Sequence, residues 1–104
     1  MKTIMLACAA GMSTSMLVTK MQEAASNQGY EADIFAVSID EAEMRVKSQT
    51  IDVILLGPQV RYHEKNFKDK FEPLGIPVAV IDMMDYGMMK GDKVLDSAIK
   101  LLGE

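Results

Sequence analysis

The feature of the sequence that most restricts its fold is a regular alternation of short apolar runs with longer amphipathic stretches. The apolar runs have the length of strands, and the amphipathic stretches repeat their apolar residues at helical spacing. Strands that alternate with helices form βαβ units, in which the strands pair in parallel and helices cover the sheet. We therefore expect a single α/β domain over residues 1–104.

Four strands and four helices follow from this pattern. Residues 51–56 are the most apolar segment and are expected to form a central strand buried on both faces. Because crossovers between parallel strands are right-handed, we expect a four-stranded parallel sheet in the order 2-1-3-4, doubly wound with helices on both faces. The strands are predicted at residues 3–7, 31–37, 51–56 and 78–81, and the helices at 15–28, at 38–48, after Gly57-Pro58 as far as Phe71, and from Asp92 onward.

Helix ends are predicted from capping residues. Gly29 is expected to end the first helix, because glycine adopts the left-handed conformation that follows many helices. Ser38 and Glu41 match the capping-box spacing at the start of the second helix. Asp92 is expected to cap the last helix.

The first predicted strand leads into Cys8, the only cysteine in the chain, and small and hydroxylated residues follow it. A strand that ends in a glycine-containing turn before a helix directs several backbone N–H groups into one concavity. Together with the helix dipole, these donors favour an anion of phosphate size, and they favour thiolate over thiol. We expect Cys8 to have a lowered pKa and to accept a phosphoryl group. The phosphate-binding residues would be Ala9, Ala10, Gly11, Met12, Ser13, Thr14 and Ser15.

An inert role is the main alternative for Cys8, since a lone cysteine in a small domain is commonly an apolar filler. Its position argues against that role. Ligands of open α/β sheets bind just beyond the carboxyl ends of the strands, where Cys8 lies. For the hydroxyls of Ser13, Thr14 and Ser15, helix capping is an alternative to contact with phosphate.

Two segments carry a resemblance to a known family. They are residues 8–15, Cys-Ala-Ala-Gly-Met-Ser-Thr-Ser, and residues 55–59, Leu-Leu-Gly-Pro-Gln; Asp82 and Tyr86-Gly87 also fit. The chain resembles the IIB component of the lactose/cellobiose class of the bacterial sugar phosphotransferase system, whose sheet is similar to that of low-molecular-weight tyrosine phosphatases. The resemblance spans essentially the whole chain.

The resemblance implies a cytoplasmic phosphotransferase that works through a phosphocysteine intermediate and needs no cofactor. Cys8 would take the phosphoryl group from a histidine of a IIA protein. It would then pass the group to a β-disaccharide of the cellobiose, lactose or chitobiose type that enters through the membrane permease IIC. The sugar itself is not evident from the sequence, and a monomer is the default expectation.

A low-molecular-weight tyrosine phosphatase is the first alternative function. Its chemistry uses Cys-x5-Arg, in which the guanidinium holds two phosphate oxygens. Here the sixth residue after Cys8 is Thr14, and the next basic residue is Lys20. The missing arginine disfavours hydrolysis and suits a carrier. Asp82 or Asp85 could act as a general acid, but either could equally be a cap or a solvated charge, and whether Tyr86 assists transfer stays open.

A single-thiol redox or anion-binding module is the second alternative. The chain lacks Gly-x-Gly-x-x-Gly, Gly-Lys-Ser/Thr and Cys-x-x-Cys, so dinucleotide, P-loop and dithiol functions are disfavoured. Asp40, Glu41 and Glu43 lack partners at metal-ligand spacing, so no metal is expected. The net charge of −4 argues against nucleic acid as a partner. No membrane span or secretory signal is expected.

The single histidine and several methionines are further candidates for functional residues. His63 is expected to be a surface or core residue in a helix, and not a phosphate relay. Met12 and Met16 flank the cysteine loop, although Met16 could equally fill the core. We expect Met12 and at least two of the methionines after the last strand to form an exposed apolar rim for docking. That second set comprises Met83, Met84, Met88 and Met89.

Overall fold

The computed structural model describes residues 1–9 and 12–103, with Met12 and Ser13 described by their backbone alone. Four parallel strands form one sheet in the order β2-β1-β3-β4, so the predicted α/β class and strand order are confirmed. The strands are β1 (Lys2–Cys8), β2 (Ala32–Ser38), β3 (Val53–Leu56) and β4 (Val78–Val80). The helices are α1 (Met12–Gln28), α2 (Ile39–Ser48), α3 (Glu64–Phe71), α4 (Met83–Gly87) and α5 (Gly91–Leu101), with 3-10 turns at Pro58–His63 and Glu72–Leu74.

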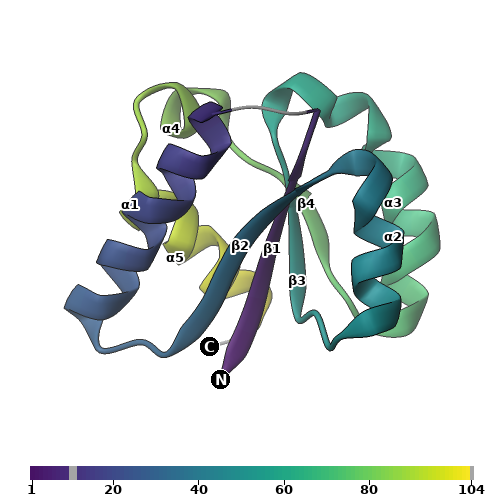
Figure 1. Ribbon diagram of the computed structural model, residues 1–104, viewed down its shortest axis with the longest axis horizontal. Helices are drawn as coiled ribbons and strands as arrows, with labels where there is room; N and C mark the ends of the chain where they lie inside the picture. The colour runs from purple at the N-terminus through teal and green to yellow at the C-terminus, as the bar shows by residue number, and fades with distance from the viewer. Residues whose placement is uncertain (10–11, 104) are drawn as a thin grey trace.

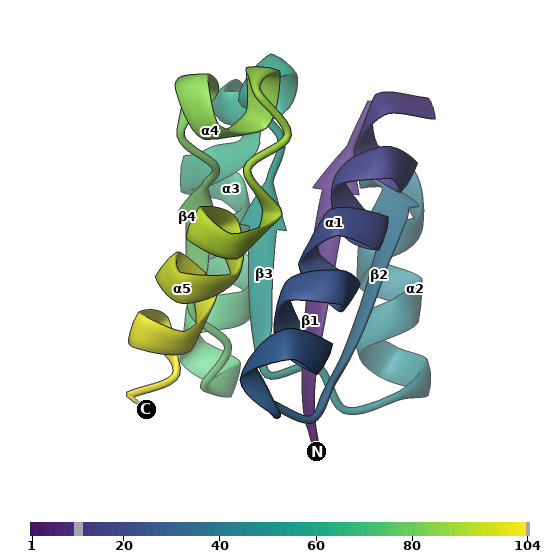
Figure 2. The same cartoon turned by 90° about the vertical axis from the view of Figure 1, so that its left-hand side faces the viewer.

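Helices cover both faces of the sheet, as predicted. Figure 1 shows α1, α4 and α5 on one side of the strands and α2 and α3 on the other. Figure 2 turns α1 and α5 toward the viewer, in front of the sheet. All four strands run in the same direction, so their carboxyl ends lie along one edge. The loops that follow β1, β3 and β4 therefore meet at that edge.

The central strands β1 and β3 divide their side chains between two cores. Ile4 and Leu6 pack on the side of α1 and α5, whereas Met5 and Ala7 pack on the side of α2 and α3. This alternation follows from the two-residue period of a strand, and burial of both faces explains why the runs are apolar throughout. The buried face of α1 is the predicted one, with Leu17, Val18, Met21 and Ala25 buried.

Gly29 ends α1 as predicted. Its φ of 68° is left-handed, the N–H of Tyr30 donates to the carbonyl of Ala25 at 2.9 Å, and the N–H of Gly29 donates to that of Ser26 at 3.2 Å. This is the Schellman arrangement, which satisfies two carbonyls that the helix leaves without partners.

One predicted helix cap is partly right and the other is wrong. Ser38 is the N-cap residue of α2, as predicted, but its hydroxyl donates to the Glu41 carboxylate at 3.0 Å and does not accept from a backbone N–H of the helix, so the capping box does not form. Asp92 lies inside the first turn of α5, which begins at Gly91 after Lys90. Gly91 also packs closely on α1, a contact that residue type alone does not reveal.

Several element bounds also differ from the prediction. α1 begins at Met12 and not at 15. Ser13 and Thr14, which were expected in the preceding loop, therefore lie in its first turn. β3 begins at Val53 and not at 51. Asp52 precedes it, and its carboxylate accepts from the N–H of Thr3 at 2.7 Å while its own N–H donates to the carbonyl of Thr3 at 2.9 Å. The helix after Gly57 starts as a 3-10 turn, and the short helix α4 lies where a loop was expected after β4.

The part of the chain that the structure describes contains no helix long and apolar enough to cross a bilayer.

Candidate active site at the carboxyl edge of the sheet

Cys8 is the last residue of β1, a central strand of the sheet. It pairs in register with Ser38 of β2, and the preceding Ala7 pairs with Leu56 of β3. The side chain is buried, with 6% of the residue exposed, and its Sγ donates a long hydrogen bond of 3.7 Å to the carbonyl of Val37. The thiol is therefore held at the edge of the sheet, where ligands of this fold class bind.

The amino terminus of α1 follows Cys8 closely in the chain. The helix begins at Met12, and the N–H groups of its first turn have no carbonyl of the same helix to bond. No acidic side chain lies in this turn, so none of its own charges offsets the positive end of the helix dipole. Such an end can accept an anion.

The predicted phosphate-binding residues are only partly described. Ala10 and Gly11 lie outside the described residues, and nothing is described of the side chains of Met12 and Ser13. Ala9 and Ser15 are exposed, whereas Thr14 is buried. Contact of any of these residues with phosphate stays a prediction.

The hydroxyl of Thr14 is hydrogen-bonded to another side chain of the protein. Its Oγ1 lies 2.8 Å from Oη of Tyr86, and the two residues are 2% and 7% exposed. The side chain therefore ties the first turn of α1 to α4, which lie beside each other in Figure 1. The parallel sheet predicted that the segments after β1 and β4 lie near each other, but the sequence left the role of Tyr86 open and did not single out its bond with Thr14.

The loop after β3 forms another wall beside Cys8. The N–H of Gly57 donates to the carbonyl of Ala7 at 3.0 Å. A Cβ at Gly57 would lie 3.6 Å from the Cβ of Cys8 and 3.2 Å from Oε1 of Gln59. Gly57 therefore lies beside Cys8, and a larger residue at position 57 would press on the exposed Gln59 side chain. Sequence reasoning cited Gln59 only as part of a motif; the Leu-Leu-Gly-Pro-Gln segment was the signal that pointed to this loop.

Asp82 is a helix cap. Its carboxylate accepts from the N–H groups of Met84 and Asp85 at 3.0 and 3.1 Å, which fixes the start of α4. This geometry matches one of the two roles that the sequence left open for Asp82. Asp85 lies in the first turn of the same helix and is partly buried.

His63 was expected in the middle of a helix, but it is the last residue of the 3-10 turn and directly precedes α3. Its ring centroid is 4.5 Å from that of Tyr62 and 6.1 Å from that of Phe67. The side chain is half-buried in this aromatic stack. The stack gives His63 a packing role, in line with the prediction.

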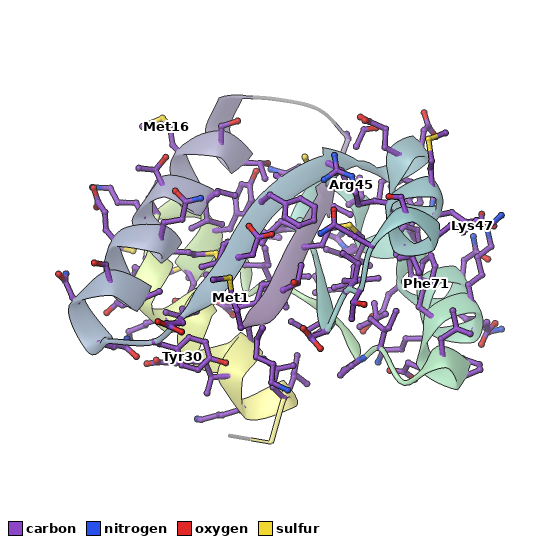
Figure 3. The ribbon with its side chains drawn as sticks, turned by 60° about the horizontal axis from the view of Figure 1, so that its bottom comes forward. Met1, Met16, Tyr30, Arg45, Lys47 and Phe71 are labelled. Atoms are coloured by element: carbon purple, nitrogen blue, oxygen red, sulfur yellow. The ribbon has the colours of Figure 1, made fainter. Side chains whose placement is uncertain are left out.

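A hollow of about 310 Å³ opens between the loop after β3 and α4. It is lined by Pro58, Gln59, Arg61, Met83, Tyr86 and Gly87. Met83, which lines the hollow, is 63% exposed, and three further methionines of α1 and the α4 region are exposed: Met16 (58%), Met84 (68%) and Met88 (60%). Figure 3 shows Met16 pointing away from the body of the protein, so it does not fill the core. We call Met16, Met83, Met84 and Met88 the methionine rim.

Among the described residues, no group of three or more His, Cys, Asp or Glu side chains could hold a metal ion. The chemistry available at this edge is that of a thiol, hydroxyls, an amide and a helix amino terminus.

Comparison with known proteins adds a second line of evidence. A family model described as "PTS system, Lactose/Cellobiose specific IIB subunit" matches residues 3–97. The chain is 52% identical to the cellobiose-specific EIIB component of the phosphotransferase system of Lactococcus lactis subsp. lactis (strain IL1403), covering 97% of this chain and 96% of the relative. It is 44% identical to the oligo-beta-mannoside-specific EIIB component of Bacillus subtilis (strain 168), with 98% and 97% covered.

Solved structures agree with these sequence matches. The chain is similar to a cellobiose-specific phosphotransferase IIB component of Borrelia burgdorferi, with a TM-score of 0.79, 39% identity, and 98% of this chain and 92% of the other covered. A lactose-specific IIB domain of Streptococcus pneumoniae shares the fold at a TM-score of 0.81 and 22% identity, with 95% of each chain covered.

Proposed function

Since the chain belongs to the lactose/cellobiose-specific IIB family of the phosphotransferase system, we propose that Cys8 is the residue on which it carries a phosphoryl group. The family makes the chain a sugar-specific phosphotransfer component. The observation that carries the proposal is the position of Cys8, the single thiol, at the carboxyl end of a central strand just before the amino terminus of α1.

The proposed reaction has two transfers. In the first, the Cys8 thiolate attacks the phosphorus of a phosphohistidine on a IIA protein, so that an S–P bond forms as the N–P bond breaks and the histidine nitrogen recovers its lone pair. In the second, a sugar hydroxyl attacks the phosphorus, the S–P bond breaks, Cys8 departs as the thiolate, and the hydroxyl proton passes to water. Both steps depend on positioning and on donors that stabilise the equatorial oxygens.

We assign those donors to the backbone of residues Ala9 to Ser15. The start of α1 supports the assignment, because the N–H groups of Met12, Ser13 and Thr14 have no partners within the helix. Small residues at Ala9, Ala10 and Gly11 would let the backbone approach the phosphate closely. Thr14 stands where a phosphatase of similar fold needs arginine, which favours a carrier over a hydrolase.

The partners follow from the same proposal. The donor is a IIA protein, and the acceptor is a β-disaccharide or related sugar delivered by a membrane permease IIC, so the chain would work in the cytoplasm as one domain and as a monomer. The names of the relatives include cellobiose, galactose and oligo-beta-mannoside, so similarity alone does not select the sugar. The methionine rim provides an apolar, adaptable surface on which two unlike partners could dock in turn.

The experiment is incubation of the chain with a phosphorylated IIA protein, followed by measurement of its intact mass. The proposal expects a gain of one phosphoryl group that acid releases. A redox module would gain none, and a phosphatase would release inorganic phosphate without a stable phosphorylated form.

A further inference from the structure

Two buried hydroxyls connect α1 and α4, two helices that are far apart in the chain. Thr14 and Tyr86 are separated by 72 residues, and their Oγ1 and Oη atoms lie 2.8 Å apart. Thr14 is 2% exposed and Tyr86 is 7% exposed, so bulk water has little access to either group. Since both groups are buried, each hydroxyl has the other as a hydrogen-bonding partner in place of water. A phenylalanine at position 86 would fill the same space but could not form this bond. The Tyr86 hydroxyl therefore fixes how Thr14 is oriented, in addition to the packing of the ring.

The Thr14–Tyr86 hydrogen bond lies at the amino terminus of α1. Thr14 is in the first turn of α1, whose backbone N–H groups lack partners within the helix. Tyr86 is in α4, and the carboxylate of Asp82 fixes the start of that helix through two backbone N–H groups. The hydrogen bond between the two hydroxyls therefore connects the amino terminus of α1 to α4, whose own start is held by the Asp82 cap.

We propose that Tyr86 is a positioning residue for phosphoryl transfer. Through its hydroxyl it fixes Thr14, and with it the direction of the N–H groups at the start of α1 that face the phosphoryl group on Cys8. This inference rests on the proposed function. Donors contribute most to transfer when they are fixed before the reaction, because no free energy is then spent on their reorganisation.

The test compares Tyr86→Phe, Thr14→Val and the double variant in phosphorylation by phospho-IIA. Each single variant should lower kcat by about tenfold with KM nearly unchanged, because positioning errors act on the transition state. The double variant should be no slower than the slower single variant, since both changes remove the same hydrogen bond. Thr14→Ser, which keeps the hydroxyl, should restore most of the rate.

Tyr62→Phe is the matched control, because Tyr62 is 75% exposed and its ring contact is with His63. It should transfer at the wild-type rate. A wild-type kcat for Tyr86→Phe, or losses that multiply in the double variant, would overturn the proposal.

A readout that does not use IIA separates this proposal from the proposed function. Inorganic phosphate is titrated into the wild-type protein and Tyr86→Phe while the amide signals of residues 12–15 are followed by NMR. Weaker phosphate binding in Tyr86→Phe supports the positioning role even when the wild-type protein accepts no phosphoryl group. Equal binding contradicts the positioning role, whatever the outcome with IIA.

Discussion

Gly91, the first residue of α5, lies directly against the backbone of Lys20 in α1. A Cβ at position 91 would lie 2.6 Å from the Cβ of Lys20, and equally close to the backbone nitrogen of Met21. We expect Gly91→Ala to destabilise the protein by about 1–3 kcal/mol, because α5 must shift away from α1 to admit the methyl group. Chemical denaturation followed by circular dichroism measures the change.

Gly87→Ala is the matched control for that variant. Gly87 also lies in a helix of the same layer, but nothing lies within 4 Å of the position its Cβ would take. Its free energy of unfolding should stay within about 0.5 kcal/mol of the wild-type value. Equal stability of the two variants would show that the close approach of the two helices does not restrict residue 91.

The sheet could be predicted from sequence because its apolar pattern is unambiguous. The run Ile51–Leu56 contains the buried strand β3, and the helical spacing of Leu17, Val18 and Met21 identifies the buried face of α1. With parallel strands and right-handed crossovers, few strand orders remain, and the predicted one was confirmed.

Tertiary contacts explain where the sequence prediction failed. Asp52 was predicted within the third strand, and its carboxylate instead bonds the N–H of Thr3, which is 49 residues away. The close contact of Gly91 with Lys20 of α1 also joins residues that are far apart in the chain. The bond between Thr14 and Tyr86 was not predictable for the same reason, since no local pattern encodes a contact between two side chains 72 residues apart.

Asp82 provides a test that separates a cap from a general acid. Asp82→Asn keeps a side-chain oxygen that can accept from the N–H groups of Met84 and Asp85, so we expect near-wild-type stability and transfer rate. Asp82→Ala loses both bonds and should cost about 1 kcal/mol. Thermal unfolding and phosphorylation kinetics measure the two effects. If the Asp82→Asn variant is stably folded but has a much lower rate of phosphoryl transfer, Asp82 acts as a proton donor and not only as a cap.

The methionine rim should contribute to docking of IIA. We expect Met83→Ser combined with Met84→Ser to raise KM for phospho-IIA by about tenfold, because two exposed apolar side chains are lost from the contact surface. The value of kcat should change little, since neither side chain approaches Cys8 in the proposed mechanism. Steady-state kinetics with varied IIA concentration gives both constants.

Met44→Ser is the control for the docking prediction. Met44 is 72% exposed, but it lies in α2, on the other side of the sheet from α4. Its KM should equal that of the wild-type protein. If the Met44 variant and the rim variant raise KM alike, general surface hydrophobicity is responsible and the rim is not a docking site.

Phosphorylation of Cys8→Ser tests the central claim most directly. A serine at the end of β1 is nearly isosteric and should preserve the fold, but its hydroxyl is a far poorer nucleophile than a thiol near neutral pH. With phospho-IIA in excess, the intact mass of the wild-type chain should rise by one phosphoryl group, located on the peptide that contains Cys8, whereas the mass of Cys8→Ser should stay unchanged. A folded Cys8→Ser variant that gains the phosphoryl group at the wild-type rate would contradict the assignment of Cys8 as the carrier.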